Sequence, residues 1–250
     1  MMLCVCCLSF FSSFAQIDDF HVELKEELIP PKEPMAVDMG GSVLWSSFNL
    51  CAEDPTEVGI YCGWGDPTGV LRFQADDPNG ENYIDIESCL AIYGGLEPPQ
   101  NIAGKDIDVV HRNLGNGWQM PTLLDFSELI SDCEWEITRI NGTLGYKVTA
   151  KNGNSIFLPS WNNEIGKEDG IDVVYGAYWT SFTCSYDFYD EYGGIPIGCY
   201  RICLHEIPWC IKDKDIIDCG VIPSKGHLLM STPRWNQLMI RPVKKKAGAE

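Results

Sequence analysis

The pattern of apolar and polar positions in the second half of the chain predicts short antiparallel strands. Residues 135–140, 145–150 and 155–158 are rich in β-branched and aromatic side chains. The pairs Asn141-Gly142 and Asn152-Gly153 separate these runs, and Asn-Gly favours a hairpin because both turn residues need a positive φ. We therefore expect an antiparallel meander in this part of the chain.

Two short helices are predicted before the meander. Residues 105–114 have the composition of a short helix that stops at Gly115. A second helix follows Pro121, because Thr122 can cap its first turn and Asp125 can complete a capping box. The apolar residues of this second helix fall on one face: Leu123, Phe126, Leu129 and Ile130.

The remaining part of the chain contains fewer periodic signals. Residues 42–50 carry β-forming residues after the Gly40-Gly41 turn, and residues 238–243 also have strand character. Residues 66–101 are rich in Gly, Pro and Asp, which is typical of long loops. Residues 176–243 mix aromatic residues, cysteines and turn formers, so we expect mostly irregular structure there. The predicted fold class is α+β, with antiparallel strands, two short helices and a long loop-rich lobe.

The N-terminus has the pattern of a secretory signal. Residues 1–16 contain no charge, and the apolar run over residues 3–14 leads to Ser13-Phe14-Ala15, so we expect cleavage after Ala15. The run is shorter than the roughly 20 residues of a membrane-spanning helix. A buried N-terminal strand is the alternative interpretation. We divide the chain into a signal peptide (1–15), a polar leader and linker (16–35), one folded domain (36–243) and a basic tail (244–250).

Charge restricts the partners of the chain. Its 36 acidic and 18 basic residues give a formal net charge of −18. Nucleic acid is excluded as a partner because phosphate binding needs clustered Lys and Arg, and the one basic cluster, Lys244-Lys245-Lys246, is interpreted as a solvated tail. Excess carboxylate is compatible with calcium, but no calcium-binding motif is present, so we predict no cofactor.

The cysteine content favours disulfides in an exported chain. Nine of the 12 cysteines follow the signal, and five of them lie between Cys184 and Cys219, where we expect disulfide bonds of open connectivity. The odd number leaves at least one free thiol. Zinc binding is an alternative role for four residues of this segment: Cys199, Cys203, His205 and Cys210. Their spacing matches no familiar zinc motif.

Catalytic signatures are missing from the sequence. The histidines His21, His111, His205 and His227 belong to no recognisable triad or zinc-protease motif. Nucleophile-elbow and phosphate-binding glycine motifs are also missing. A carboxylate pair for glycoside cleavage has no sequence spacing of its own and stays open. We therefore do not expect an enzyme.

Several motifs occur together in a recognisable order. The first blocks are Val37-Asp38-Met39-Gly40, Gly59-x-Tyr61-x-x-Trp64-Gly65 and Leu114-Gly115-x-Gly117-Trp118-Gln119-Met120-Pro121-Thr122. The later blocks are Glu128-Leu129-Ile130, Cys133-x-Trp135, Gly145-Tyr146-Lys147-Val148, Asn152-Gly153-Asn154-Ser155-Ile156-Phe157-Leu158-Pro159, Gly176-x-Tyr178-Trp179-Thr180-Ser181 and Ile240-Arg241-Pro242-Val243. Over residues 37–243 this order resembles the Fibrobacter succinogenes major paralogous domain family, exported proteins of Bacteroidetes-type bacteria.

The resemblance implies export and a C-type-lectin-like fold, whereas the family has no settled activity. Its relatives include enzymes that generate formylglycine with a reactive cysteine pair, for which Cys199 and Cys203 are candidates, although the other signature residues are missing. Calcium-dependent sugar binding in C-type lectins uses a Trp-Asn-Asp motif, and Trp235-Asn236-Gln237 lacks the final carboxylate. A lectin of that mechanism is not expected.

Two groups of residues have expected roles. Structural roles are expected for Trp45, Trp64, Trp118, Pro121, Trp135, Asn152, Asn154 and Arg241. Arg241 would neutralise a buried carboxylate, such as Asp38 or Glu128. Ligand contact is expected from the C-terminal segment, because Tyr and Trp provide contact area at low entropy cost: Tyr178, Trp179, Tyr186, Tyr189, Trp209, Trp235 and Asn236.

The expected function is that of a non-enzymatic binding or adhesion module, exported to the periplasm, the outer surface or the medium. Its ligand would be a glycan or a surface protein. The alternatives are a structural subunit of a surface appendage, an unrecognised enzyme related to formylglycine-generating proteins, and a receptor diversified by a retroelement.

Overall fold

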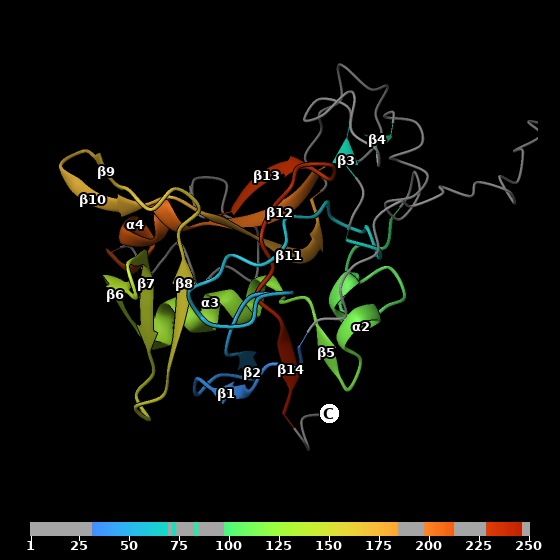
Figure 1. The fold of residues 1–250 in the computed structure, drawn as a ribbon, viewed down its shortest axis with the longest axis horizontal. Helices are drawn as coiled ribbons and strands as arrows, with labels where there is room; N and C mark the ends of the chain where they lie inside the picture. The colour runs from blue at the N-terminus through green and yellow to red at the C-terminus, as the bar shows by residue number, and fades with distance from the viewer. Residues whose placement is uncertain are drawn as a thin grey trace, which may run out of the picture.

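The computed structural model describes residues 32–69, 72–73, 83–84, 98–184, 198–212 and 229–246. These residues form several small sheets, mostly antiparallel, with few helices (Figure 1). The α+β class expected from the sequence is found at this coarse level, with β structure in the majority. The expected signal peptide and most of the leader lie outside the described residues.

The two ends of the described chain meet in one four-stranded sheet. Its order is β1 (Ala36–Asp38), β2 (Val43–Ser46), β14 (Val243–Lys245) and β5 (Trp118–Gln119), with antiparallel neighbours. The basic cluster is therefore not a solvated tail: Lys244 pairs with Leu44 on one side and Trp118 on the other. Lys246 also forms a 2.8 Å ion pair with Asp38.

The last strand is displaced from its expected position over residues 238–243. Residues 238 and 239 make only isolated bridges to other segments, and the continuous strand starts at Val243. Pro242 precedes the strand, and a proline has no backbone N–H to contribute to the ladder. The sequence pattern therefore marked the correct segment but not the paired residues.

The predicted meander is confirmed. β6 (Glu134–Ile140), β7 (Thr143–Thr149) and β8 (Ser155–Pro159) form a three-stranded antiparallel sheet. Asn141 and Gly142 make the two-residue turn between β6 and β7 with φ values of 51° and 87°. This is the positive-φ pair that the Asn-Gly signal predicts.

Helix is scarce in the described residues, as the sequence indicates. The helical elements are α2 (Val109–Leu114), α3 (Leu123–Asp132), the 3₁₀ turn η1 (Leu204–Glu206) and α4 (Ile207–Lys212). α3 begins at the predicted capping box of Thr122 and Asp125. α2 starts four residues later than expected, because the side chain of Asp108 accepts hydrogen bonds from the N–H groups of Val110 and His111 as N-cap. The sequence did not predict α4.

The C-terminal segment contains more strand than expected. β11 (Ala177–Thr183), β12 (Gly198–Cys203) and β13 (Leu229–Pro233) form a three-stranded antiparallel sheet. Tyr178 belongs to one hydrophobic cluster, whereas Ala177 and Trp179 belong to another. Because β11 is covered on both faces, its sequence lacks the apolar-polar alternation of a half-exposed strand.

Two ribbons complete the described sheets. β9 (Ile165–Glu168) and β10 (Ile171–Val174) form an antiparallel hairpin, which projects at the upper left of Figure 1. β3 (Arg72–Phe73) and β4 (Tyr83–Ile84) make a short parallel pair. None of the described helices is long and apolar enough to cross a membrane.

Tryptophans are distributed over the two hydrophobic clusters. Trp45 lies in the first cluster, 5.0 Å from Phe126 in edge-to-face geometry, and Trp64 and Trp118 lie in the second. All three tryptophan side chains are buried. Trp135 is half-buried and packs against the first cluster.

The partners of Arg241 differ from those expected. The guanidinium is fully buried and donates hydrogen bonds to the carbonyl oxygens of Ser46 and Phe157, and it also bonds the Tyr178 side chain. Neither Asp38 nor Glu128 is its partner. Burial lowers the pKa of Arg241 to about 10. Arg241 therefore joins segments from three sheets through neutral acceptors.

Candidate functional site

Three of the residues expected to contact a ligand lie in the core. Tyr178 and Trp179 are fully buried, and Trp235 is 7% exposed. The Trp179 indole Nε1 donates to the Cys62 carbonyl at 2.7 Å. These side chains are not accessible to a ligand, because β11 carries the first two between the two hydrophobic clusters. Their assignment as contact residues is corrected accordingly.

The other expected contact residues contribute little to a surface. Tyr186, Tyr189 and the side chain of Trp209 lie outside the part of the chain that the structure describes. Asn236 is half-buried, and its amide bonds the Thr232 hydroxyl. The described part of this segment therefore does not assemble the expected aromatic surface.

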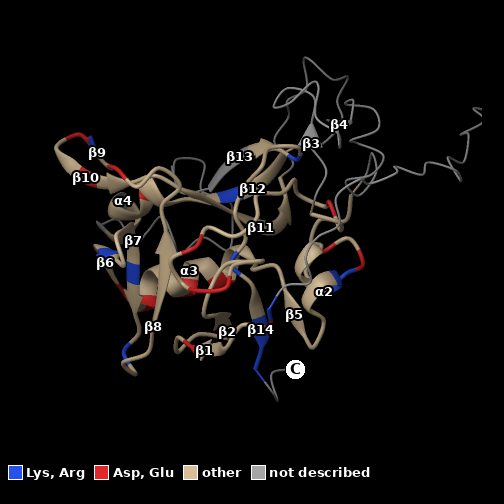
Figure 2. Ribbon diagram, in the orientation of Figure 1, with Lys and Arg blue, Asp and Glu red and all other residues tan. Residues whose placement is uncertain are grey.

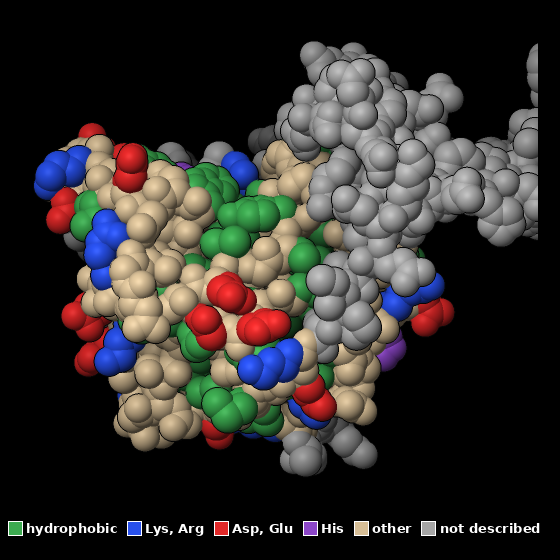
Figure 3. All heavy atoms as spheres, viewed as in Figure 1, with side chains coloured by type: hydrophobic (Ala, Val, Ile, Leu, Met, Phe, Trp, Pro, Cys, Tyr) green, Lys and Arg blue, Asp and Glu red, His purple; other side chains and the backbone are tan. Residues whose placement is uncertain are grey.

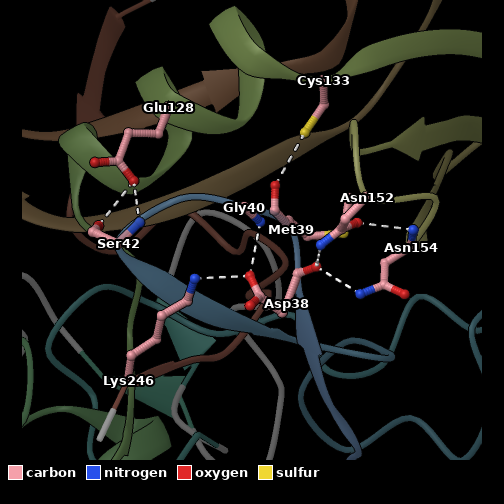
Figure 4. A network of polar contacts seen from close by, with 9 residues as sticks. All are labelled: Asp38, Met39, Gly40, Ser42, Glu128, Cys133, Asn152, Asn154 and Lys246. Atoms are coloured by element: carbon pink, nitrogen blue, oxygen red, sulfur yellow. Dashed lines mark hydrogen bonds and ion pairs between the residues drawn. The ribbon is translucent and has the colours of Figure 1, made fainter. Parts of the chain in front are cut away.

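The loop between β1 and β2 is held by polar contacts from the β7–β8 turn, from α3 and from Lys246, which pairs with Asp38 (Figure 4). The Asn152 and Asn154 amides donate to the Asp38 carbonyl at 2.9 and 2.8 Å. Asn154 N–H also donates to the Asn152 side chain at 3.0 Å. Glu128 of α3 accepts from the backbone and hydroxyl of Ser42. Because these groups satisfy one another, the cluster positions the loop and is not a ligand site.

Cysteine chemistry is disfavoured at the expected positions. Cys199 and Cys203 lie four residues apart on β12, which corresponds to about 13 Å at roughly 3.3 Å per residue, whereas a disulfide needs Cα atoms within roughly 7 Å. Burial raises the pKa of Cys203 to about 11 and raises the pKa of Cys199 well above its usual range. The two residues therefore do not form the reactive pair that the resemblance suggested.

No disulfide joins two cysteines within the described ranges. Cys89 and Cys219 lie outside them, so disulfide bonding of the C-terminal segment stays a prediction. The same ranges contain no group of three or more His, Cys, Asp or Glu side chains that could hold a metal ion.

Acidic residues gather in the loop after β2, on the face shown in Figures 2 and 3. Glu53, Asp54 and Glu57 are all exposed. Asp54 accepts from the backbone and hydroxyl of Thr56, and Glu57 accepts from the backbone of Glu53. These carboxylates stabilise their own loop, and an acidic cluster of this kind does not define a binding site.

Among the residues that the structure describes, Trp161 is the exposed large aromatic side chain. Its exposed fraction is 45%, and that of Ile165, four residues further on, is 50%. Asn162 and Glu164 between them are exposed too. We call these four side chains, Trp161, Asn162, Glu164 and Ile165, the Trp161 surface. It lies where β8 ends and the β9–β10 hairpin begins.

The loop that carries Trp161 is fixed by hydrogen bonds on both sides. Trp161 N–H donates to the Tyr175 carbonyl at 3.1 Å, and the Ser160 hydroxyl bonds the same oxygen at 2.9 Å. The Asn163 side chain accepts from Leu144 N–H at 2.6 Å and from the Arg139 guanidinium at 2.8 Å. The loop is therefore anchored to the end of β10 and to the β6–β7 hairpin.

The adjacent hairpin is also held in place. Asp169 and Gly170 form its turn with φ values of 49° and 79°. The Tyr175 ring packs so closely on Gly166 that an added Cβ would lie 2.4 Å from it. On its other side Tyr175 faces the His205 ring, with centroids 5.8 Å apart. A side chain at position 166 would displace Tyr175 and the hairpin.

The indole of Trp161 differs in its hydrogen bonding from four less exposed indoles, although not from buried Trp45, whose Nε1–H also makes no hydrogen bond with a described residue. Trp64, Trp135 and Trp179 each donate Nε1–H to a backbone carbonyl, and Trp118 donates to Glu33. The Trp161 Nε1–H makes no hydrogen bond with any residue that the structure describes. A buried indole usually finds a protein acceptor, so Trp161 retains a donor and a ring face for an external partner.

Sequence reasoning did not single out the Trp161 surface, although a signal was present. Trp161 is followed by Asn162, Asn163 and Glu164 and preceded by Ser160. Polar, turn-forming residues surround this tryptophan in the sequence. It therefore belongs to no periodic apolar pattern of the kind that marks the buried face of a helix or strand. That context distinguishes it from Trp179, which lies in a strand.

No protein-family model matches this chain, and neither a curated protein nor a solved structure shows significant similarity to it.

Proposed function

We propose that this protein is an exported, non-enzymatic binding or adhesion module whose contact site is the Trp161 surface. In this proposal the fold is a C-type-lectin-like domain of the Fibrobacter succinogenes major paralogous type. The uncharged N-terminal segment and the order of the sequence motifs support export and that family. The mainly antiparallel α+β arrangement is compatible with the proposed fold.

The observation that carries the proposal is an exposed indole on an immobilised loop. Trp is enriched among the residues that dominate binding energy, where a rigid ring adds contact area. The bonds of Ser160 and Asn163 hold the loop before any ligand arrives, so little ordering entropy is lost on binding. Trp161 is 45% exposed, so part of its side chain stays in contact with water and it contributes less to folding than the buried tryptophans.

Catalysis by a thiol is disfavoured on the same physical grounds. Burial raises the pKa of Cys203 to about 11 and that of Cys210 to about 12. The thiolate is the nucleophile of cysteine enzymes, and these groups are protonated at neutral pH. A binding role for the module needs no such group.

Export is tested by expressing the full chain and separating cytoplasm, periplasm, membranes and medium. We expect the protein outside the cytoplasm, with a mature N-terminus at Gln16 by mass spectrometry. Retention of residues 1–15 in a cytoplasmic protein would contradict the proposal.

Binding is tested with the mature protein on a glycan array and on a panel of immobilised extracellular proteins. We expect a specific signal that Trp161→Ala abolishes. Leu124→Ala is the matched control, because Leu124 is 63% exposed on α3 and lies outside the Trp161 surface. Polymerisation without ligand binding would instead favour the appendage subunit, and turnover of glycan or ester substrates would favour an enzyme.

A further inference from the structure

We propose, on the basis of the binding function above, that the ligand of the Trp161 surface is a neutral saccharide whose pyranose ring stacks on the indole of Trp161. The inference rests on the chemistry of the four exposed side chains, on their charge and on their mixed apolar and polar composition.

The indole provides a surface for an apolar sugar face. A pyranose ring presents several C–H groups on one side, and these carry partial positive charge. The face of an aromatic ring carries the negative part of the π quadrupole. With 45% of Trp161 exposed and its loop fixed, the indole can contact a sugar ring without rearrangement of the backbone.

Free polar groups lie next to the ring in sequence and share its loop. Asn162 Oδ1 accepts from the Ser160 hydroxyl at 2.9 Å and from Glu164 N–H at 3.3 Å, whereas its Nδ2 amide has no partner among the described residues. The Glu164 carboxylate is exposed and accepts no hydrogen bond from them. The loop therefore offers amide and indole donors and a carboxylate acceptor. Sugar hydroxyls both donate and accept, so they can use all three groups.

The charge around the surface selects against anionic ligands. Glu164 lies in it, and Glu168, Asp169 and Asp172 lie on the adjoining hairpin. Two cations lie nearby, and both are engaged: Lys167 pairs with Asp172 at 2.6 Å, and the Arg139 guanidinium donates to the Asn163 side chain and to the Asn163 and Gly142 carbonyls. In Figure 2 the ribbon of the β9–β10 hairpin carries both red acidic and blue basic positions. Together with the net charge of −18, this arrangement disfavours sialylated, sulfated or phosphorylated sugars.

The composition of the surface favours a small ligand over a folded protein. A stable protein interface buries about 800 Å² on each partner and has an apolar centre. Only two of the four exposed side chains, Trp161 and Ile165, are apolar, and the other two carry hydrogen-bonding groups. One ring with polar groups beside it matches one or two sugar residues.

The test is a glycan array that contains neutral, sialylated and sulfated oligosaccharides, read with calcium and again with chelator. The best neutral ligand is then measured by calorimetry against wild type and variants. We expect neutral glycans to bind in both buffers, because stacking needs no metal ion. Trp161→Ala should weaken binding by roughly tenfold or more, which corresponds to one stacked ring at 1.4 kcal/mol per decade.

Further variants separate stacking from hydrogen bonding. Trp161→Phe keeps a flat ring and should lose less affinity than Trp161→Ala. Asn162→Asp keeps the Oδ1 acceptor for Glu164 and removes the Nδ2 donor, so it should weaken binding several-fold. Leu124→Ala should bind like wild type. The thermal midpoints of Trp161→Phe, Asn162→Asp and Leu124→Ala should stay close to wild type, whereas Trp161→Ala removes a ring that is 45% exposed and therefore partly packed, and should lower the midpoint modestly.

The outcomes distinguish this inference from the function on which it rests. Neutral glycan binding that is unchanged in Trp161→Ala, or lost in chelator, overturns the stacking site. Preference for anionic glycans, or binding to an extracellular protein alone, overturns the saccharide assignment and leaves a binding module. The absence of any ligand on both panels overturns the binding function itself.

Discussion

The carboxylate of Asp108 connects three backbone segments although it is a single buried side chain. It accepts hydrogen bonds from the N–H groups of Val110 and His111 at the start of α2. It also accepts from Gly104 in the preceding turn and from Met120 after β5, at 2.8 and 2.9 Å. Burial raises the pKa of Asp108, and the four N–H donors oppose that shift by stabilising the ionised form. The position of α2 therefore depends on this residue.

Asp108→Ala should lower the free energy of unfolding by about 2–4 kcal/mol, because several buried N–H groups lose their acceptor. Urea unfolding followed by circular dichroism measures the change. Asp106→Ala is the matched control, since Asp106 is exposed in the same turn, and it should stay within about 0.5 kcal/mol of wild type. Equal effects of the two substitutions would show that the four contacts contribute nothing.

At the scale of elements, α3 is the helix whose start follows directly from its sequence. The Thr122 hydroxyl accepts from Asp125 N–H, and the Asp125 carboxylate accepts from Thr122 N–H at 2.7 Å. The buried face of the helix then places Phe126 against Trp45. In α3 the local capping signal and the tertiary packing favour the same helix. For this reason the sequence predicted both the start of the helix and its inner face.

Thr122→Ala should destabilise the protein by about 1 kcal/mol through loss of the N-cap acceptor. Differential scanning calorimetry detects this as a lower transition temperature. The control is Ser131→Ala in the last turn of the same helix, where the exposed hydroxyl bonds only the Glu128 carbonyl. A transition temperature for Thr122→Ala that equals the control value would contradict the capping role.

At the scale of the whole molecule, the C-terminal strand closes the fold. β14 pairs with β2 and with β5, and Val243 is fully buried. Lys246 adds the ion pair with Asp38 at 2.8 Å. A strand in the middle of a sheet makes hydrogen bonds along both edges. The four-stranded sheet is therefore complete only when β14 is present.

Truncation after Pro242 should abolish cooperative unfolding, because it removes β14, the buried Val243 side chain and the pair with Asp38. Truncation after Lys246 should leave the thermal midpoint unchanged. Near-ultraviolet circular dichroism during heating distinguishes the two proteins. A cooperative transition in the shorter protein would mean that β2 and β5 do not need the strand between them.

Much of the fold was predictable where neighbouring residues determine it. The Asn141-Gly142 turn, the capping box at Thr122 and the meander strands follow from positive φ, side-chain capping and runs of β-forming residues between Asn-Gly turns. The predictions were poor where contacts with a distant segment of the chain determine the local structure. β11 is covered on both faces and therefore shows no alternation, and the strand expected over residues 238–243 starts only after Pro242.

The same distinction holds for the candidate site: some of its properties follow from the sequence alone, and others require the tertiary structure. The sequence by itself determined that aromatic residues are abundant, that the chain is strongly acidic and that its turns are rich in Asn and Gly. Only the tertiary structure decided that Tyr178 and Trp179 are core residues, that Arg241 is bound by carbonyl oxygens, and that Trp161 faces solvent. The physical reason is that the exposure of an aromatic ring depends on which distant segments pack over it, and no local pattern of residues records that.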